Sequence, residues 1–200
     1  EEGDPAVSGA RQFYTLSLPT DQPIPWQARW LETAVEAITT RHPEQELVLV
    51  GHSAGGVVAR FLLVTGEMDV VNMLVTISSP HSGSELSELG RSVGQALGAT
   101  PMGMATPFLG LDDLQRSQGL LSDLERPRPG NLLAWLNMQP HPEIRYVSII
   151  RPGDRIVAPT SQDMNGVPAL AGRSAVREID GGHSLDPAIG RVLVEMFVEP

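Results

Sequence analysis

The pentapeptide Gly51-His52-Ser53-Ala54-Gly55 decides the fold, because it lies between a strand-like run and a helix-like run. Residues 47–50 before it (Leu-Val-Leu-Val) form a continuous apolar stretch that is typical of a buried parallel strand. Residues 54–64 after it begin with small side chains and continue with apolar ones at helical spacing. A G-x-S-x-G sequence between a strand and a helix is typical of a nucleophile elbow, a sharp turn that exposes the serine hydroxyl.

This turn predicts chemical roles for Ser53 and Ala54. Glycines would let the chain turn sharply enough to lift the serine hydroxyl clear of the sheet. The helix that follows would direct its N-terminal N–H groups at an oxyanion forming beside the serine. We therefore predict that Ser53 is a nucleophile and that the N–H of Ala54 binds the oxyanion.

Composition limits the class of protein. The 200 residues are enough for one α/β domain with a substantial core, so we predict a single domain over residues 1–200. A net charge of −10 leaves no basic surface for nucleic acid. Cysteine is absent, which excludes disulfides and thiolate metal sites, and the five histidines show no metal-ligand spacing. The sequence thus predicts no metal, no cofactor and no nucleic-acid partner.

The location of the protein stays open at this level. No window is long and apolar enough to span a membrane. The first residues, Glu1-Glu2-Gly3-Asp4-Pro5, are acidic and do not resemble a signal peptide. Both a cytoplasmic protein and a secreted protein after processing fit these observations, and the oligomeric state is also open.

Strand-like and helix-like segments alternate along the chain. The helix-like segments outside the middle of the chain are residues 26–40, 54–64 and 187–198. The strand-like segments are residues 13–18, 47–50, 73–78, 144–150 and 175–179. Such alternation predicts crossover connections and a mostly parallel sheet covered by helices on both faces.

Residues 83–142 separate two strand-like segments by more than a compact α/β connection requires. Helix-like patches at 85–97, 111–124 and 131–137 predict a helical cap or lid inserted before the strand that carries the acid. Its apolar residues could line an acyl-binding pocket or form the small core of the insertion itself, and periodicity fits both. These residues are Met102, Met104, Phe108, Leu109 and Leu111.

A serine nucleophile needs a base and a group that orients the base, in the chain order serine, acid, histidine. His183 lies in a glycine-rich loop directly after the last strand-like segment, and we predict that it is the base. Asp154 lies in the loop after the preceding strand-like segment, and we predict that it is the acid. The alternative is an aspartate at a Pro-Gly turn that pairs with Arg155.

Other candidates of the same residue types have weaker positional arguments. The rival acids are Glu85, Asp163 and Asp186. His52 flanks the nucleophile, where its ring would be structural or would form part of the substrate-binding wall. The remaining histidines are interpreted as turn residues (His42 and His141, each before a proline) or as fixing the loop after a strand (His81).

With these residues in place, the chain resembles the α/β-hydrolase superfamily, and within it the lipase branch. That branch includes bacterial triacylglycerol lipases and GPI-inositol-deacylase-like proteins. The motif of residues 79–84 (Ser-Pro-His-Ser-Gly-Ser) is similar to the P-H-x-G-[ST] loop of those lipases, and residues 153–159 (Gly-Asp-Arg-Ile-Val-Ala-Pro) look like their acid loop. Residues 131–137 resemble a cap helix less specifically. The resemblance implies an α/β-hydrolase fold over most of the chain from Phe13 onward.

The chain departs from that superfamily before Ser53. There, a central strand is followed by a loop, usually beginning His-Gly, that supplies a second oxyanion N–H, and no such motif occurs here. We expect that the chain is a fragment or a processed piece. The alternative is that residues 13–18 occupy the vacant central position, so that residues 19–25 form the wall of the oxyanion site.

These observations predict a serine hydrolase that cleaves carboxylic esters, with an acyl or lipid substrate. A thioesterase would use the same residues. A catalytically impaired hydrolase-fold scaffold or binding protein is the non-enzymatic alternative, because the second oxyanion donor has no candidate. Haloperoxidation on the same residues is a third alternative that no feature favours.

Overall fold

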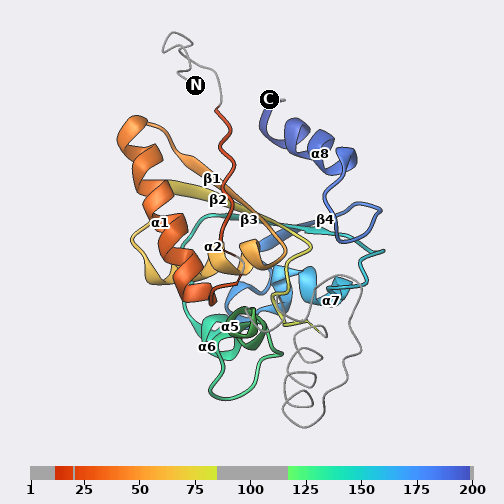
Figure 1. The fold of residues 1–200 in the computed structure, drawn as a ribbon. Helices are drawn as coiled ribbons and strands as arrows, with labels where there is room; N and C mark the ends of the chain where they lie inside the picture. The colour runs from red at the N-terminus through yellow and green to blue at the C-terminus, as the bar shows by residue number, and fades with distance from the viewer. Residues whose placement is uncertain (1–11, 20, 85–116, 199–200) are drawn as a thin grey trace. The chain divides into compact units, whose positions relative to one another are not determined.

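The computed structural model describes residues 12–19, 21–84 and 117–198. Its described strands form one parallel sheet in the order β1-β2-β3-β4 (Figure 1). Their bounds are β1 Leu47–His52, β2 Val71–Ile77, β3 Arg145–Ile150 and β4 Ser174–Glu178. In the register of the sheet, Val50 pairs with Val75, Val75 with Val147, and Val147 with Ala175. The four strands predicted from residue 47 onward are confirmed.

The predicted strand at residues 13–18 is wrong. Residues 12–19 have no helix or strand, and within the described chain β1 pairs only with β2. Phe13, Tyr14 and Leu16 are 67%, 48% and 48% exposed. An apolar pattern makes a strand only where a neighbour accepts its backbone hydrogen bonds, and this segment has no such neighbour in the described sheet. The alternative in which residues 13–18 lie in the vacant central position stays a prediction.

Burial differs between the middle and the edges of the described sheet. β2 and β3 are buried along nearly their whole length, as parallel strands covered on both faces are. β1 instead alternates, and Val48 and Val50 are 36% and 44% exposed. The apolar run of residues 47–50 thus predicted the strand correctly. The prediction that this strand is buried is wrong, because β1 lies at an edge of the described sheet.

Two long helices pack together beside β1 and β2. Helix α1 (Ile24–Arg41) packs on helix α2 (Ala54–Thr65), and α2 packs on both strands. Their shared core holds Ile24, Ala28 and Val35 of α1 against Val57, Val58 and Leu62 of α2. The helices predicted at residues 26–40 and 54–64 are therefore confirmed, with ends that differ by one or two residues.

Two short helices from the predicted cap region lie near the same core (Figure 1). They are α5 (Gln118–Asp123) and α6 (Leu132–Met138), and Asn131 caps α6 by accepting from the N–H of Ala134 at 2.9 Å. Asp123 Oδ2 accepts from the first N–H of α1, at Ile24, at 2.7 Å. The predicted patch at residues 85–97 lies outside the described residues, so a lid stays a prediction.

The segment between β3 and β4 folds into short turns. It contains α7 (Pro159–Gln162) and the 3-10 helices η1 (Met164–Gly166) and η2 (Pro168–Leu170). Met164, Val167 and Leu170 are fully buried in a second core cluster with Leu74 of β2 and Tyr146 of β3. This packing fixes the path of the chain that leaves the carboxyl end of β3.

The chain divides into two compact units. Residues 18–184 hold the sheet, and residues 1–17 and 185–200 form the other unit. In the latter, α8 (Pro187–Val198) has the bounds predicted from its sequence. Asp186 Oδ1 caps α8 by accepting from the N–H groups of Ala188 and Ile189 at 2.9 and 3.2 Å. Of the described helices, none combines the length and the apolar character needed to cross a bilayer.

Candidate functional site

The predicted catalytic residues follow three different strands of one parallel sheet. Ser53 comes directly after β1, Asp154 is in the loop after β3, and His183 is in the loop after β4. Parallel strands present their carboxyl ends at the same edge, which is where open α/β sheets bind ligands. The sheet topology therefore gathers residues that are 29 and 130 positions apart in the sequence.

The backbone at Ser53 has an unusual conformation. Ser53 has φ 53° and ψ −130°, and it is the residue before the first turn of α2. Its N–H donates to Ile77 O at 2.9 Å, and its own carbonyl accepts from Gly56 N at 3.1 Å. A positive φ at a non-glycine residue stores backbone strain and persists only where surrounding contacts hold it. The close contacts of β1 and α2 do so here.

Gly51 and Gly56 beside the turn serve close packing rather than a positive φ. A Cβ at Gly51 would lie 2.5 Å from Gly56 Cα, and a Cβ at Gly56 would lie 2.2 Å from Ser79 Oγ. Among the described residues, nothing lies within 4 Å of a Cβ placed at Gly55. The expectation that glycine freedom makes the turn is thus corrected, because Ser53 itself takes the positive φ.

A continuous chain of hydrogen bonds joins the three predicted catalytic residues. Ser53 Oγ lies 3.0 Å from His183 Nε2, and His183 Nδ1 lies 2.8 Å from Asp154 Oδ2. Asp154 Oδ1 accepts from the N–H groups of Ile156 and Val157 at 2.8 and 3.0 Å. The structure therefore brings these three side chains together.

The protonation states of this chain follow from Asp154. Burial alone would raise the pKa of Asp154, but hydrogen bonds from the Val157 N–H, His183 and the Ile156 N–H outweigh it and hold the pKa below its ordinary value. An ionised carboxylate only accepts, so His183 Nδ1 carries the proton and donates. His183 Nε2 is then free to accept the proton of the Ser53 hydroxyl.

The rival acids are occupied elsewhere or lie outside the described residues. Asp163 Oδ1 accepts from Asn165 N at 2.8 Å, and Asp186 caps α8. Glu85 is outside the described residues. Asp154 is thus the carboxylate that contacts His183 within the described chain.

His52 contacts the backbone of His183. Since a carbonyl oxygen only accepts, His52 Nε2–H donates to His183 O at 2.7 Å, and the two ring centroids are 5.0 Å apart. Burial lowers the pKa of His52 below its ordinary value, which keeps the ring neutral. The structure gives His52 a contact with the base, whereas its role in substrate binding stays a prediction.

Gln162 is a further residue of this site that the sequence did not indicate. It is 1% exposed at the end of α7, and its amide contacts Arg151, Asp154 and Val157. No motif or spacing in the sequence marks a glutamine for this role. The contact arises because α7 folds back onto the loop that follows β3.

A second buried group surrounds Arg60 of α2, which is fully buried. Arg60 donates to His141 Nε2 at 3.2 and 3.3 Å, to His81 Nδ1 at 3.2 Å, and to Asn137 Oδ1 at 2.9 Å. In the described part of the chain no carboxylate pairs with Arg60. His81 Nε2 donates in turn to Thr76 Oγ1 at 3.0 Å. The prediction that His81 fixes the loop after a strand agrees with these contacts. His141, interpreted from the sequence as a turn residue, is in addition a buried hydrogen-bond acceptor of Arg60.

The charge state of this cluster follows from burial and from the arginine. Burial lowers the pKa of Arg60 to about 9. Burial, and then the charge of Arg60, lowers the pKa of His141 to about 4 and that of His81 well below its ordinary value. Both imidazoles are therefore neutral acceptors at neutral pH.

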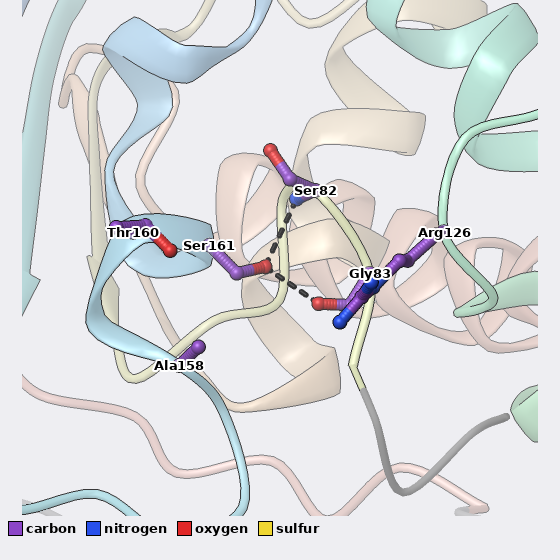
Figure 2. A pocket seen from close by; sticks show the side chains of 6 residues that line it. All are labelled: Ser82, Gly83, Arg126, Ala158, Thr160 and Ser161. Atoms are coloured by element: carbon purple, nitrogen blue, oxygen red, sulfur yellow. Dashed lines mark hydrogen bonds between the residues drawn. The ribbon is translucent and has the colours of Figure 1, made fainter. Parts of the chain in front are cut away.

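Two cavities lie beside Ser82. The smaller, about 170 Å³, is lined by Ser82, Gly83, Arg126, Ala158, Thr160 and Ser161 (Figure 2). Ser161 Oγ donates to Gly83 O at 2.6 Å and accepts from Ser82 N at 3.1 Å, which joins the two loops that form the wall. The larger, about 440 Å³, has a mainly apolar lining beside α6 that includes Pro127, Pro129, Ala134, Met138 and Pro168.

Met102, Met104, Phe108, Leu109 and Leu111 lie outside the described residues. Their role in substrate binding stays a prediction. In the part of the chain that the structure describes, no three histidine, aspartate or glutamate side chains are arranged to hold a metal ion.

Sequence comparison finds a family match over part of the chain. Residues 22–93 match the PGAP1-like alpha/beta domain. A GPI inositol-deacylase from Debaryomyces hansenii is 34% identical over 68 residues, which cover 30% of this chain and 7% of that protein. The chain thus spans only a small part of the length of this curated relative.

Structural comparison extends the likeness over most of the chain. A lipase from Bacillus licheniformis, in its mature form, has a TM-score of 0.64 at 14% identity, covering 89% of this chain and 74% of that one. The monoacylglycerol lipase of Paleococcus ferrophilus has a TM-score of 0.58 at 15% identity, covering 90% and 75%. Likeness at such low identity shows the fold alone. The chain therefore has the α/β-hydrolase fold, with a PGAP1-like segment at residues 22–93, and resembles the lipase-like members of that superfamily.

Proposed function

We propose that the protein is a serine hydrolase that cleaves carboxylic esters. The observation that carries this proposal is the chain of hydrogen bonds from Ser53 Oγ through His183 to Asp154, at 3.0 and 2.8 Å. A serine hydroxyl is a weak nucleophile at neutral pH, and a histidine held by a carboxylate is the arrangement that activates it. The turn at Ser53 would then act as a nucleophile elbow.

In the proposed reaction, Ser53 Oγ attacks the carbonyl carbon of the ester while its proton passes to His183 Nε2. Asp154 orients His183 and stabilises the imidazolium, and the N–H of Ala54 binds the oxyanion. The tetrahedral intermediate collapses, the acyl–oxygen bond breaks, and the departing alcohol takes the proton from His183. Water that gives a proton to His183 then attacks the acyl-enzyme, and collapse releases the acid and returns the proton to Ser53.

The Ala54 N–H belongs to the first turn of α2, where a backbone N–H has no acceptor within its own helix. The N-terminus of α2 also stabilises negative charge placed beside it. A second donor is not assigned, and one donor of this kind contributes on the order of 10²–10³ in turnover. We therefore expect a modest rate from the described residues alone.

For the substrate we propose an acyl or lipid ester. Two similar structures are named as lipases, one of them a monoacylglycerol lipase. The larger cavity offers a mainly apolar wall beside α6, as an acyl chain would require. A thioester would react through the same residues, so the leaving group must be tested with both chemical types.

The test is hydrolysis of p-nitrophenyl butyrate and p-nitrophenyl palmitate by the protein and by Ser53→Ala. We expect the substitution to lower turnover on the order of 10⁴-fold or more, because it removes the attacking atom. Ser78→Ala is the matched control, since Ser78 also follows a parallel strand with a positive φ of 52° but is fully buried. That variant should keep the activity.

The outcomes separate the alternatives. Equal, near-zero rates in all three proteins, together with no labelling of Ser53 by a fluorophosphonate probe, would contradict the proposal and favour a scaffold or binding role. The ratio of palmitate to butyrate hydrolysis would show whether long acyl chains are accommodated.

A further inference from the structure

The side chain of Gln162 has a fixed orientation beside the end of β3. It is 1% exposed, and its Oε1 accepts from the N–H of Arg151 at 2.7 Å. An N–H can only donate, so the amide oxygen of Gln162 must face Arg151 and the amide nitrogen must face the other way. The direction of the two Nε2 hydrogens follows from this contact.

The amide nitrogen faces three oxygens of the loop that carries Asp154. Nε2 lies 2.8 Å from Val157 O, 3.3 Å from Asp154 Oδ2 and 3.4 Å from Arg151 O. One hydrogen therefore serves Val157, and the second lies between Asp154 and Arg151. The oxygen that it reaches on Asp154 is the same one that accepts from His183 Nδ1 at 2.8 Å.

We propose that Gln162 is a positioning residue, which holds the carboxylate of Asp154 in the orientation that serves His183. This proposal rests on the proposed function, because it concerns the same acid and base. Gln162 forms hydrogen bonds with Arg151, the first residue after β3, with Asp154 and with Val157, so one side chain holds three positions of the loop. It also donates to Asp154 Oδ2, so that this oxygen accepts from both Gln162 and His183.

The proposal explains why an amide, and not a carboxyl group, suits position 162. A glutamate would have nearly the same shape, and one of its oxygens would still accept from Arg151 N–H. Its second oxygen would face Val157 O and the carboxylate of Asp154, where a negative charge is repelled. When protonated, that oxygen could donate as the amide does. Gln162→Glu is therefore a replacement whose effect depends on pH.

The test combines kinetics with the titration of the His183 ring followed by NMR. In Gln162→Glu we expect the second negative charge to raise the midpoint of that titration by about one pH unit or more. The acid limb of the pH profile of kcat/KM for p-nitrophenyl butyrate should move to higher pH by the same amount. We expect kcat to fall about tenfold to a hundredfold above that limb, because the base is displaced, with little change in KM.

Gln45→Glu is the matched control, since it makes the same chemical change at an exposed residue before β1. It should leave both the kinetics and the titration unchanged. Thermal unfolding of each variant shows whether the fold is kept. If Gln162→Glu does not fold, the unchanged protein still tests the proposal. In the unchanged protein, the NMR resonances of the Gln162 side-chain amide should shift across the pH range in which His183 titrates, because both side chains contact Asp154 Oδ2.

The results distinguish this proposal from the proposed function. A folded Gln162→Glu with the wild-type pH profile and His183 titration would overturn the positioning role, as would Gln162 amide resonances that stay constant while His183 titrates. If Ser53→Ala has no effect on turnover, the proposed function fails. The NMR titration then still decides whether Gln162 acts on His183.

Discussion

His52 precedes Ser53 in the sequence, yet its side chain bonds to a backbone carbonyl 131 residues away, at His183. The contact fixes the loop that presents the base. Because burial lowers the pKa of His52, the ring stays neutral and does not place a positive charge beside His183. The residue next to the proposed nucleophile thus acts on the position of the proposed base.

We predict that His52→Ala lowers kcat by roughly tenfold, because the His183 loop loses its anchor and the base moves away from Ser53. His52→Gln should recover most of the activity, since a glutamine Nε2 can reach a similar position and donate to the same carbonyl. Steady-state kinetics of both variants on p-nitrophenyl butyrate provide the measurement. Equal losses in both would show that the hydrogen bond to His183 O is not what matters.

At the scale of elements, the junction of β1 and α2 requires glycine at some of its glycine positions and not at others. Gly51 and Gly56 are in close backbone or side-chain contact, as a Cβ at either would lie within 2.5 Å of another atom. Gly55 has space for a side chain within the described structure. The G-x-S-x-G pattern therefore contains one glycine that packing demands and one that it does not.

We predict opposite effects for alanine at these two positions. Gly51→Ala should reduce the free energy of unfolding by about 2 kcal/mol or more, because the backbone of α2 must shift to admit the methyl group. Gly55→Ala should leave it unchanged or raise it by up to about 1 kcal/mol, because alanine favours the helix. Urea denaturation of the two variants measures both. A Gly55→Ala variant as unstable as Gly51→Ala would show that the chain is closely packed there after all.

At the scale of the whole molecule, the Arg60 cluster joins segments that are far apart in the sequence. Arg60 belongs to α2, His81 follows β2, Asn137 belongs to α6, and His141 precedes β3. The buried cation is stabilised by neutral acceptors, and their protonation would replace each acceptor with a like charge. The cluster therefore links the stability of the unit of residues 18–184 to pH.

We predict that the protein loses stability in mild acid. The pKa of His141 is about 4 in the folded protein, below its ordinary value of 6.5, so the unfolded chain binds a proton more readily. The stabilisation is complete above pH 6.5 and is lost as the pH falls to about 4, at a cost of roughly 3 kcal/mol. The pKa of His81 is also lowered in the folded protein, so protonation of His81 in acid reduces the stability in the same way.

Denaturation followed from pH 7 to pH 4 checks this prediction. His141→Gln should flatten the dependence, because glutamine does not titrate and its Oε1 can accept from Arg60. His42→Gln is the control, since His42 lies outside the cluster at the end of α1. An equally steep loss of stability in His141→Gln would assign the acid lability to other groups.

The sequence by itself determined the elements and their order. Local apolar patterns predicted β1 to β4, α1, α2 and α8, since burial on one face or both imposes a period that the residues must follow. The elbow motif, and the place of Asp154 and His183 after successive strands, also named three residues that the structure brings together. A local pattern cannot create a pairing partner, so the strand predicted at residues 13–18 is wrong.

Only the tertiary structure decided which side chains act on one another. The contacts of Gln162 with Asp154, of His52 with His183 and of Arg60 with His81 and His141 join residues from separate loops and helices. Such contacts depend on how the elements pack, and no local pattern encodes them. The sequence likewise attributed the sharp turn at Ser53 to the glycines, whereas in the structure Ser53 itself takes the positive φ and Gly51 packs closely against Gly56.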